Sequence, residues 1–244
     1  MAQWAQMDLR GEAWGEVVER CPLFGGLTED ELRLVTSLAR ERRLRRKGVF
    51  FREGDKPCAL HLLLTGEVTL KQASVDGQEV IVRLVGAGEA FALASALEGA
   101  TYPVTAEALR ASHALVWDQP AVQELLNRIP SVSRNALAVL LRRIRELEQR
   151  FREVATERVA QRLARTLLRL ARHAGRKVEG GVLIDLPLSR EELAQMTGTT
   201  LFTVSRCLAE WERQGLVEAG REKVLIRSTH GLVTVAEDLP SRGE

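Results

Sequence analysis

Residues 188–217 read LSREELAQMTGTTLFTVSRCLAEWERQGLV, and this stretch predicts two helices joined by a glycine turn. Ser189 and Glu192 have the spacing of a capping box, in which each side chain accepts a hydrogen bond from the other residue's backbone N–H. The box predicts a first helix over residues 189–196. Gly198 then supplies the turn, where a Cβ atom would restrict the backbone.

The second helix of this pair has one apolar and one polar face. Thr199 or Thr200 is placed to cap its start, and Gly215 suits its end. At about 100° per residue, the residues expected to be buried are Leu201, Val204, Cys207, Leu208 and Trp211. Those expected to point outward are Phe202, Arg206, Ala209 and Arg213, with Thr203 and Ser205 on the flanks.

The outward face carries groups that read base edges in a DNA major groove. Arg206 can donate two parallel hydrogen bonds to guanine, and Phe202 can contact a thymine methyl group. Hydroxyl groups of Ser205 and Thr203 can assist, and Thr200 is a further candidate contact. We therefore expect sequence-specific binding to double-stranded DNA. From these residues alone, an ordinary helical hairpin with a solvated charged face remains the alternative.

The segment after the helix pair predicts a wing. Residues 216–226 fit a strand, a turn and a second strand, as in a winged helix. Arg221 and Lys223 fall near its turn, where they can approach phosphates. Arg190, at the start of the first helix, is another phosphate candidate.

Composition indicates a globular protein without a membrane segment. The chain has 244 residues, 45% of them hydrophobic and 28% charged, with a net charge of only +2. No apolar run is long enough to span a bilayer and no signal peptide is visible, so we expect a cytoplasmic protein. Because the net charge is small, DNA binding must come from a local basic patch.

The sequence offers no catalytic or metal-binding motif. Its cysteines (Cys21, Cys58 and Cys207) are far apart, and its histidines (His61, His113, His173 and His230) are scattered. Without clustered ligands, a zinc site or an iron–sulfur cluster is not expected, and the thiols are interpreted as inert. GxSxG, HExxH and P-loop motifs are also absent. We therefore expect no enzyme activity and no resident cofactor.

The first half of the chain predicts a β-rich domain. Short apolar runs separated by glycines extend over residues 48–118 and suggest a barrel or a jelly-roll-like β-roll. Residues 62–70 are expected to form a hairpin. The Asp76-Gly77 pair is expected to turn into a further strand over residues 80–85. The interior can hold a small ligand or only a core.

A long helix over residues 131–154 carries a narrow apolar seam. Its members alternate in spacing between three and four residues and are Leu137, Leu140, Ile144, Leu147, Phe151 and Val154. This heptad pattern favours a parallel homodimer, with Arg143 and Glu148 placed to pair between chains. The alternative is that the stripe packs on the chain's own β-domain. A two-fold dimer would read a near-palindromic site.

The order β-roll, long helix and winged helix resembles the CRP/FNR family of bacterial transcription regulators over residues 21–228. The motifs that carry the resemblance are CPLFGGL at 21–27, FFREGD at 50–55, LLTGEV at 63–68, TERVAQRL at 156–163 and TVSR at 203–206. The resemblance implies an α+β fold with a cyclic-nucleotide-binding-like β-roll, a dimerisation helix and a C-terminal winged helix-turn-helix. It also implies a homodimeric regulator with RNA polymerase as a partner.

The expected domain organisation follows from this resemblance. It comprises an N-terminal arm (1–20), the sensor-like β-roll (21–130), the dimerisation helix (131–155), the DNA-binding domain (156–230) and a C-terminal tail (231–244).

The chain departs from the cAMP-binding members of the family it resembles. Their Gly-Glu pair aligns near Ala92-Leu93, and their Arg-Ser pair near Tyr102-Pro103. Arg143 and Ile144 replace the helix hydroxyls that bind adenine, and the cluster cysteines of the oxygen-sensing branch are absent. We therefore expect no cAMP binding of the usual kind and leave the effector open.

Three further interpretations stay open. One is a haem- or gas-sensing member of the family, with His61 or His113 as an axial ligand. Another is a catalytic β-barrel protein with a helical appendage. The last concerns Phe202, which stands where many members have a base-reading glutamate. Its ring either contacts a thymine methyl group or packs against the wing.

Overall fold

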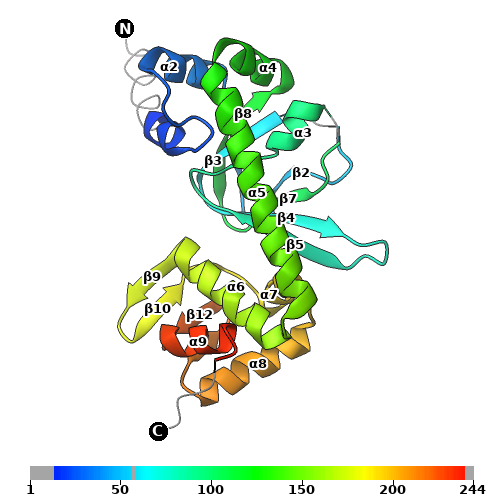
Figure 1. The fold of residues 1–244 in the computed structure, drawn as a ribbon, viewed down its shortest axis with the longest axis vertical. Coiled ribbons are helices and arrows are strands. Elements are labelled where there is room, and N and C mark those ends of the chain that lie inside the picture. Colours follow the sequence, from blue (N-terminus) through cyan, green and yellow to red (C-terminus); the bar gives the residue numbers. More distant parts are fainter. Residues whose placement is uncertain (1–13, 57–58, 100, 240–244) are drawn as a thin grey trace. The chain divides into compact units, whose positions relative to one another are not determined.

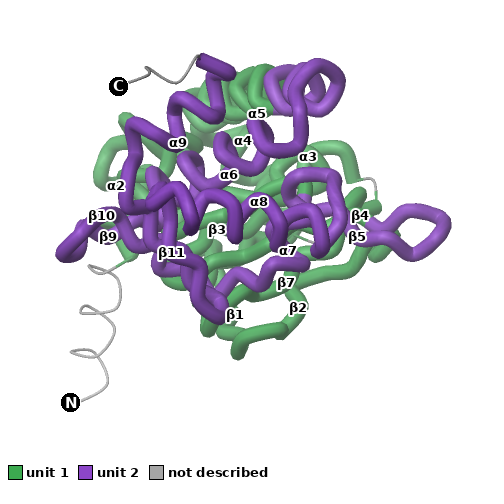
Figure 2. Tube along the Cα trace, turned by 90° about the horizontal axis from the view of Figure 1, so that it is seen from below, with its two compact units in different colours: residues 1–72, 82–146 green, residues 73–81, 147–244 purple. Residues whose placement is uncertain are grey.

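The computed structural model describes residues 14–56, 59–99 and 101–239, which form two compact units (Figure 2). One unit comprises residues 1–72 and 82–146, and the other comprises residues 73–81 and 147–244. Trp4 of the expected N-terminal arm lies outside the described residues, whereas residues 14–20 are helical. No helix in the described ranges is long and apolar enough to cross a membrane.

The expected β-roll is present and consists of two four-stranded sheets. One sheet has the order β1 (Arg40–Leu44), β8 (Ser112–Asp118), β3 (Ala59–Thr65) and β6 (Ala90–Phe91). The other has the order β2 (Val49–Phe51), β7 (Thr105–Ala108), β4 (Val68–Ala73) and β5 (Glu79–Val85). The Asp76-Gly77 turn joins the neighbours β4 and β5, as expected.

The prediction of a hairpin over residues 62–70 was wrong, because its two strands do not pair with one another. The strands β3 and β4 follow one another across a tight turn, but they belong to different sheets. Gly66 permits this corner because its φ is 93° and a Cβ atom would lie only 2.4 Å from the Ser112 hydroxyl. The chain therefore changes sheet where a simple hairpin was expected.

Short helices flank the β-roll. They are α2 (Glu29–Ser37), α3 (Leu93–Glu98) and α4 (Gln119–Arg128). A capping box between Thr28 and Glu31 starts α2, and Asp118 caps α4. The long helix α5 (Pro130–Thr156) follows and includes the whole predicted span 131–154 (Figure 1).

The C-terminal unit contains a winged helix. Its helices are α6 (Val159–Ala174), α7 (Arg190–Thr197), α8 (Leu201–Arg213) and α9 (Thr229–Ala236). Its sheet has the order β11 (Val217–Gly220), β12 (Lys223–Ile226), β10 (Gly181–Ile184) and β9 (Gly175–Val178). The wing, β11 and β12, confirms the predicted strand–turn–strand. The β9–β10 hairpin was not predicted.

The helix α9 extends the packed chain beyond residue 230, where the DNA-binding domain was expected to end. Leu232 and Ala236 of α9 are buried, and Ser228 caps the helix by accepting a hydrogen bond from the Gly231 amide. The region expected to be a tail from residue 231 therefore begins with a packed helix.

Candidate nucleic-acid interface and β-roll interior

The helix α7 begins at the predicted capping box. The Ser189 amide donates to Glu192 Oε2 at 2.7 Å, and the Glu192 amide donates to Ser189 Oγ at 3.1 Å. Gly198 ends the helix in the left-handed conformation, with φ 61°. Thr200, rather than Thr199, caps α8, because its hydroxyl accepts a hydrogen bond from the Thr203 amide at 3.3 Å.

The inward face of α8 is shorter than the helical wheel predicted. Val204, Leu208 and Trp211 are buried, but Leu201 is 42% exposed and Cys207 is only half-buried. Leu201 is the first residue of α8, so its side chain lies at the helix end rather than along the packed stripe. The expectation that Leu201 is buried was therefore wrong.

The outward face of α8 is open to solvent. The Phe202 ring is 83% exposed, so it does not pack against the wing in this structure. Arg206, one turn further along, is exposed and has no ion-pair partner among the described residues. This face therefore presents an arginine and an aromatic ring side by side.

Polar side chains surround this face. Arg190 Nη1 donates to Ser205 Oγ at 3.3 Å, which joins the start of α7 to α8. The hydroxyls of Thr200 and Thr203 lie 3.1 Å apart. Lys223, on the wing strand β12, is exposed. All seven predicted DNA-contact residues thus lie in the C-terminal unit, on α7, α8 and the wing or, for Thr200, at the cap of α8.

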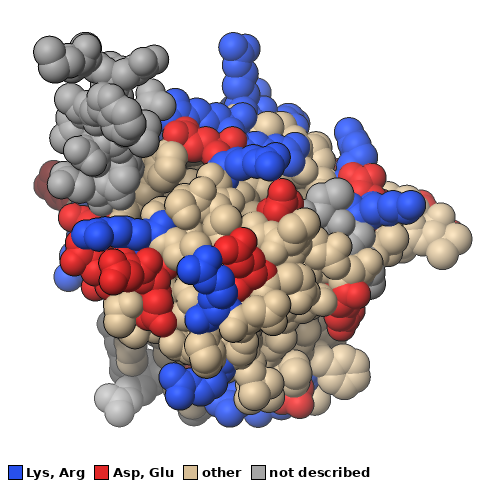
Figure 3. Space-filling model, turned by 90° about the horizontal axis from the view of Figure 1, so that it is seen from above, with Lys and Arg blue, Asp and Glu red and all other residues tan. Residues whose placement is uncertain are grey.

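Basic and acidic side chains are mixed on at least one face of the molecule. On the face shown in Figure 3, lysine and arginine side chains alternate with aspartate and glutamate. Such a mixed surface agrees with the net charge of +2. Attraction to phosphates then depends on local cations rather than on a general positive field.

The apolar seam of α5 is largely uncovered. Five of its members, Leu137, Ile144, Leu147, Phe151 and Val154, are 52% to 77% exposed. Leu140 is half-buried and packs against the core of the β-roll unit. Of the seam residues in the same unit as the β-roll, Leu140 packs on the core of the roll, whereas Leu137 and Ile144 stay exposed.

Arg143, which was expected to pair with Glu148 between chains, also has partners within its own chain. Its guanidinium pairs with Glu89 at 3.3 Å and with Glu146 at 2.5 Å in its own chain. Pairing with Glu148 of a second chain would compete with both contacts. Glu89 also pairs with Arg83 of β5, so one carboxylate links a strand of the roll to α5. Burial, and then the nearby Arg143, lower the pKa of Arg83, while Glu89 opposes this shift.

Aromatic rings fill the interior of the β-roll. The rings of Phe51 and Tyr102 stack with centroids 3.8 Å apart and planes 11° apart. The His61 ring stacks on Phe91 at 4.8 Å, and Phe50 meets both rings edge-on. Tyr102 was identified in sequence only as a replacement for the family's Arg-Ser pair. Its role as a core residue depends on packing across the roll.

The histidines and cysteines lie in structural surroundings. His61 is buried, and desolvation, followed by the charge of Arg42, lowers its pKa from 6.5 to about 3. His113 contacts Glu41 at 3.0 Å. Burial raises the pKa of the Cys21 and Cys207 thiols, which agrees with their interpretation as inert, and Cys58 lies outside the described residues.

Comparison with known proteins matches both halves of the chain. A cyclic nucleotide-binding domain model matches residues 41–129, and a Crp-like helix-turn-helix domain model matches residues 161–235. The cyclic AMP receptor protein of Thermus thermophilus is 31% identical over 215 residues, which make up 88% of this chain and 96% of that relative. This chain belongs to the CRP/FNR family of transcription regulators.

Other CRP/FNR proteins agree with this assignment. The CRP-like cAMP-activated global transcriptional regulator of Mycobacterium tuberculosis is 25% identical over 89% of this chain and 97% of its own length. The crystal structure of a CRP-family transcriptional regulator from Thermus thermophilus is 28% identical. It matches with a TM-score of 0.69 over 80% of this chain and 96% of that one. These relatives are regulators rather than enzymes, which confirms the functional class predicted from sequence.

Proposed function

We propose that this CRP/FNR protein acts as a homodimer on a near-palindromic operator and is not controlled by cAMP in the way usual for the family. The observation that carries the homodimer is the α5 seam, where five large apolar side chains are 52% to 77% exposed in a single stripe. Burying such a stripe against a second copy removes apolar surface from water, and heptad spacing suits that packing.

The proposed operator contacts come from α8 and its surroundings. Arg206 is the principal base reader, and Phe202 is the contact for a thymine methyl group. Ser205, Thr203 and Thr200 support them with hydroxyl groups. Arg190 and Lys223 bind phosphates, which position the protein without carrying sequence information. RNA polymerase is the proposed downstream partner of the bound dimer.

Control without cAMP is supported by the packing of the β-roll. Tyr102, near the position of the family's phosphate-binding pair, stacks on Phe51 and bonds through its hydroxyl to the backbone of Ala59. The arginines beside the roll, Arg83 and Arg143, already share Glu89. A cyclic phosphate would have to displace a carboxylate or remain buried without a cation, and an unpaired buried charge is costly.

The alternatives raised by the sequence are not favoured. His61 is enclosed by the rings of Phe50, Phe51 and Phe91, and His113 is engaged by Glu41, so packing does not present either imidazole to a haem. A catalytic β-barrel is not supported by the regulator relatives.

The proposal is tested by selecting binding sites from a random double-stranded DNA library with full-length protein in the absence of any nucleotide. We expect an inverted-repeat motif with half-sites about one helical turn apart, and a dimeric mass in sedimentation. Recovery of only single half-sites, or of no enriched sequence without added nucleotide, would contradict it.

A further inference from the structure

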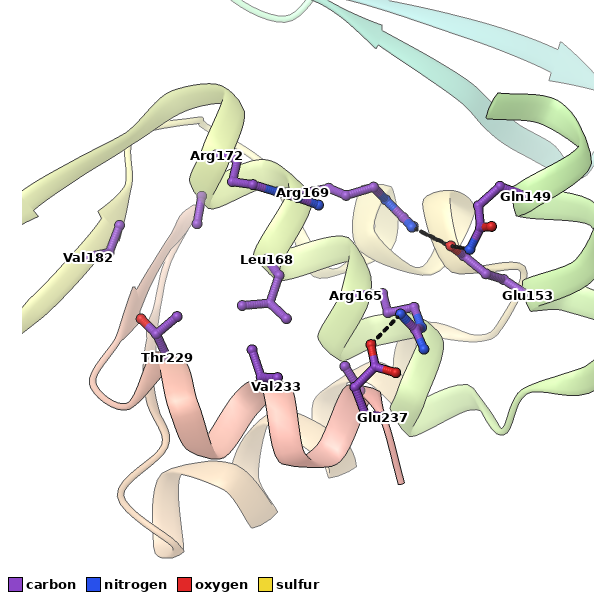
Figure 4. Close-up of a pocket in the computed structure, with 12 residues that line it drawn as sticks. Gln149, Glu153, Arg165, Leu168, Arg169, Arg172, Val182, Thr229, Val233 and Glu237 are labelled. Atoms are coloured by element: carbon purple, nitrogen blue, oxygen red, sulfur yellow. Dashed lines mark hydrogen bonds and ion pairs between the residues drawn. The ribbon is translucent and has the colours of Figure 1, made fainter. Parts of the chain in front are cut away.

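The C-terminal unit contains a groove of about 600 Å³ that the DNA-binding face does not use. Its walls are the last turns of α5, the outer face of α6 and the helix α9 (Figure 4). Pockets that hold small molecules commonly have volumes of roughly 300–1,000 Å³. The groove is therefore large enough for a small organic ligand.

The floor of the groove is apolar. In Figure 4 the side chains of Leu168 on α6 and Val233 on α9 point toward one another across the open space. Ala171, Val182 and Ala236 complete the apolar lining, and no aromatic side chain lines the groove among the described residues. Such a floor suits an aliphatic group better than a base, which would be expected to stack on a ring.

Ion pairs hold the walls in place. Glu153 of α5 is buried and accepts from Arg169 Nη1 of α6 at 2.8 Å through both carboxylate oxygens. Arg165 pairs with Glu157 at 2.9 Å and with Glu237 at the end of α9 at 2.8 Å. Three helices are thus tied together around the groove without a ligand.

Among the described residues that line the groove, one arginine has no ion-pair partner. The lining holds the arginines Arg165, Arg169 and Arg172 and the glutamates Glu153 and Glu237. Both glutamates are engaged by Arg169 and Arg165, respectively. Arg172 is exposed and has no ion pair within the described chain, and Figure 4 shows it extending along the rim beside Arg169.

We propose that this groove binds a small amphipathic organic anion. Its carboxylate or sulfonate would pair with Arg172, and its aliphatic body would cover Leu168 and Val233. A charge-assisted contact to an arginine at the rim gives orientation, and the apolar floor gives most of the affinity. An occupant contacts α6 and α9 and lies beside the end of α5, so it stabilises one arrangement of these helices.

The probe is decanoate, with decanol as the uncharged molecule of equal chain length. Titration of full-length protein should shift the NMR methyl signals of Leu168 and Val233 in a saturable manner. Decanol should bind about two- to fivefold more weakly, as expected for loss of one exposed charge contact. The assay contains no DNA, so its failure leaves the proposed regulatory function untouched.

Two charge-reversal variants locate the site. Arg172→Glu should weaken decanoate binding by about tenfold or more and leave decanol binding nearly unchanged. Arg176→Glu, which reverses an exposed arginine on β9 outside the groove, is the matched control and should bind decanoate like the wild type. Absence of saturable shifts in the wild type would overturn the proposal. Equal decanoate affinity in the Arg172→Glu and wild-type proteins would overturn it as well.

Discussion

The ring of Tyr102 lies flat on the ring of Phe51, with centroids 3.8 Å apart, inside the β-roll of this CRP/FNR protein. The Tyr102 hydroxyl accepts from the Ala59 amide at 3.0 Å and donates to the Ala59 carbonyl at 3.2 Å. Tyr102 therefore contacts both sheets of the roll, β2 through its ring and β3 through its hydroxyl. Because Tyr102 aligns near the family's phosphate-binding pair, the proposed control without cAMP depends on this packing.

Removing this side chain should lower stability in two separable steps. Tyr102→Phe keeps the stack but leaves the buried Ala59 amide without its acceptor, at a cost of about 1–3 kcal/mol. Tyr102→Ala also leaves a cavity and should cost about 3–5 kcal/mol. Urea unfolding measures both values. Equal and small losses in the two variants would show that the stack contributes little.

His61 should make stability depend on mildly acidic pH. Its pKa is about 3 in the folded protein, against 6.5 for the ordinary imidazole. Above pH 6.5 the ring is neutral in both the folded and unfolded states, so its contribution is fully present. As the pH falls from 6.5 toward 3, only the unfolded chain gains the proton, and the free energy of unfolding decreases by up to about 1.4 kcal/mol per pH unit.

The measurement is urea unfolding between pH 7 and about pH 5, where most carboxylates remain ionised. The variant His61→Leu removes the titrating group while keeping an apolar side chain in the core. It should show a smaller decrease in stability over this range than the wild type. Identical pH slopes in the two proteins would assign the effect to other groups.

The exposed seam should control dimerisation. Phe151→Glu places a carboxylate in the proposed interface and should raise the dimer dissociation constant by roughly two to three orders of magnitude. Val75→Glu is the matched control, because Val75 is also an exposed apolar residue but lies outside α5. Sedimentation velocity compares them. A dimer that persists in Phe151→Glu at the wild-type affinity would place the interface elsewhere.

Loss of a base contact and loss of a phosphate contact should affect sequence specificity and salt dependence differently. Arg206→Ala should cost about 1–3 kcal/mol on the selected operator and relax preference at one base pair. Lys223→Ala should weaken all DNA sequences similarly and reduce the salt slope by about one. Fluorescence anisotropy at several salt concentrations measures both. If Arg206→Ala weakens random DNA as much as the operator, Arg206 is not a base reader.

Local signals predicted the helix pair α7 and α8 and the wing of the C-terminal unit. The pairing of Ser189 with Glu192 is formed by residues three apart, so the capping box and the helix start were visible in the sequence. Gly198 likewise marked the turn. Leu201 was misassigned because the helical wheel treats every turn alike, whereas the first residue of a helix lacks neighbours on one side.

Contacts between distant residues were not visible in the sequence. The strands on either side of Gly66 belong to different sheets because β3 pairs with β8, as Leu62 does with Leu115, whereas β4 pairs with β7, as Leu70 does with Ala106. The ion pair between Glu89 and Arg143 likewise joins segments 54 residues apart. A heptad pattern shows that Arg143 flanks the seam. It does not show that Arg143 pairs with Glu89 in its own chain.

The most direct test measures operator affinity with and without cyclic AMP. The selected operator, labelled with a fluorophore, is titrated with nucleotide-free full-length protein in buffer alone and in buffer saturated with cAMP. We predict the same dissociation constant in both, because Tyr102 is packed in the core of the roll and Arg83 and Arg143 are already paired with Glu89. Operator binding that appears only with cAMP, or tightens about tenfold or more on its addition, would contradict control without cAMP.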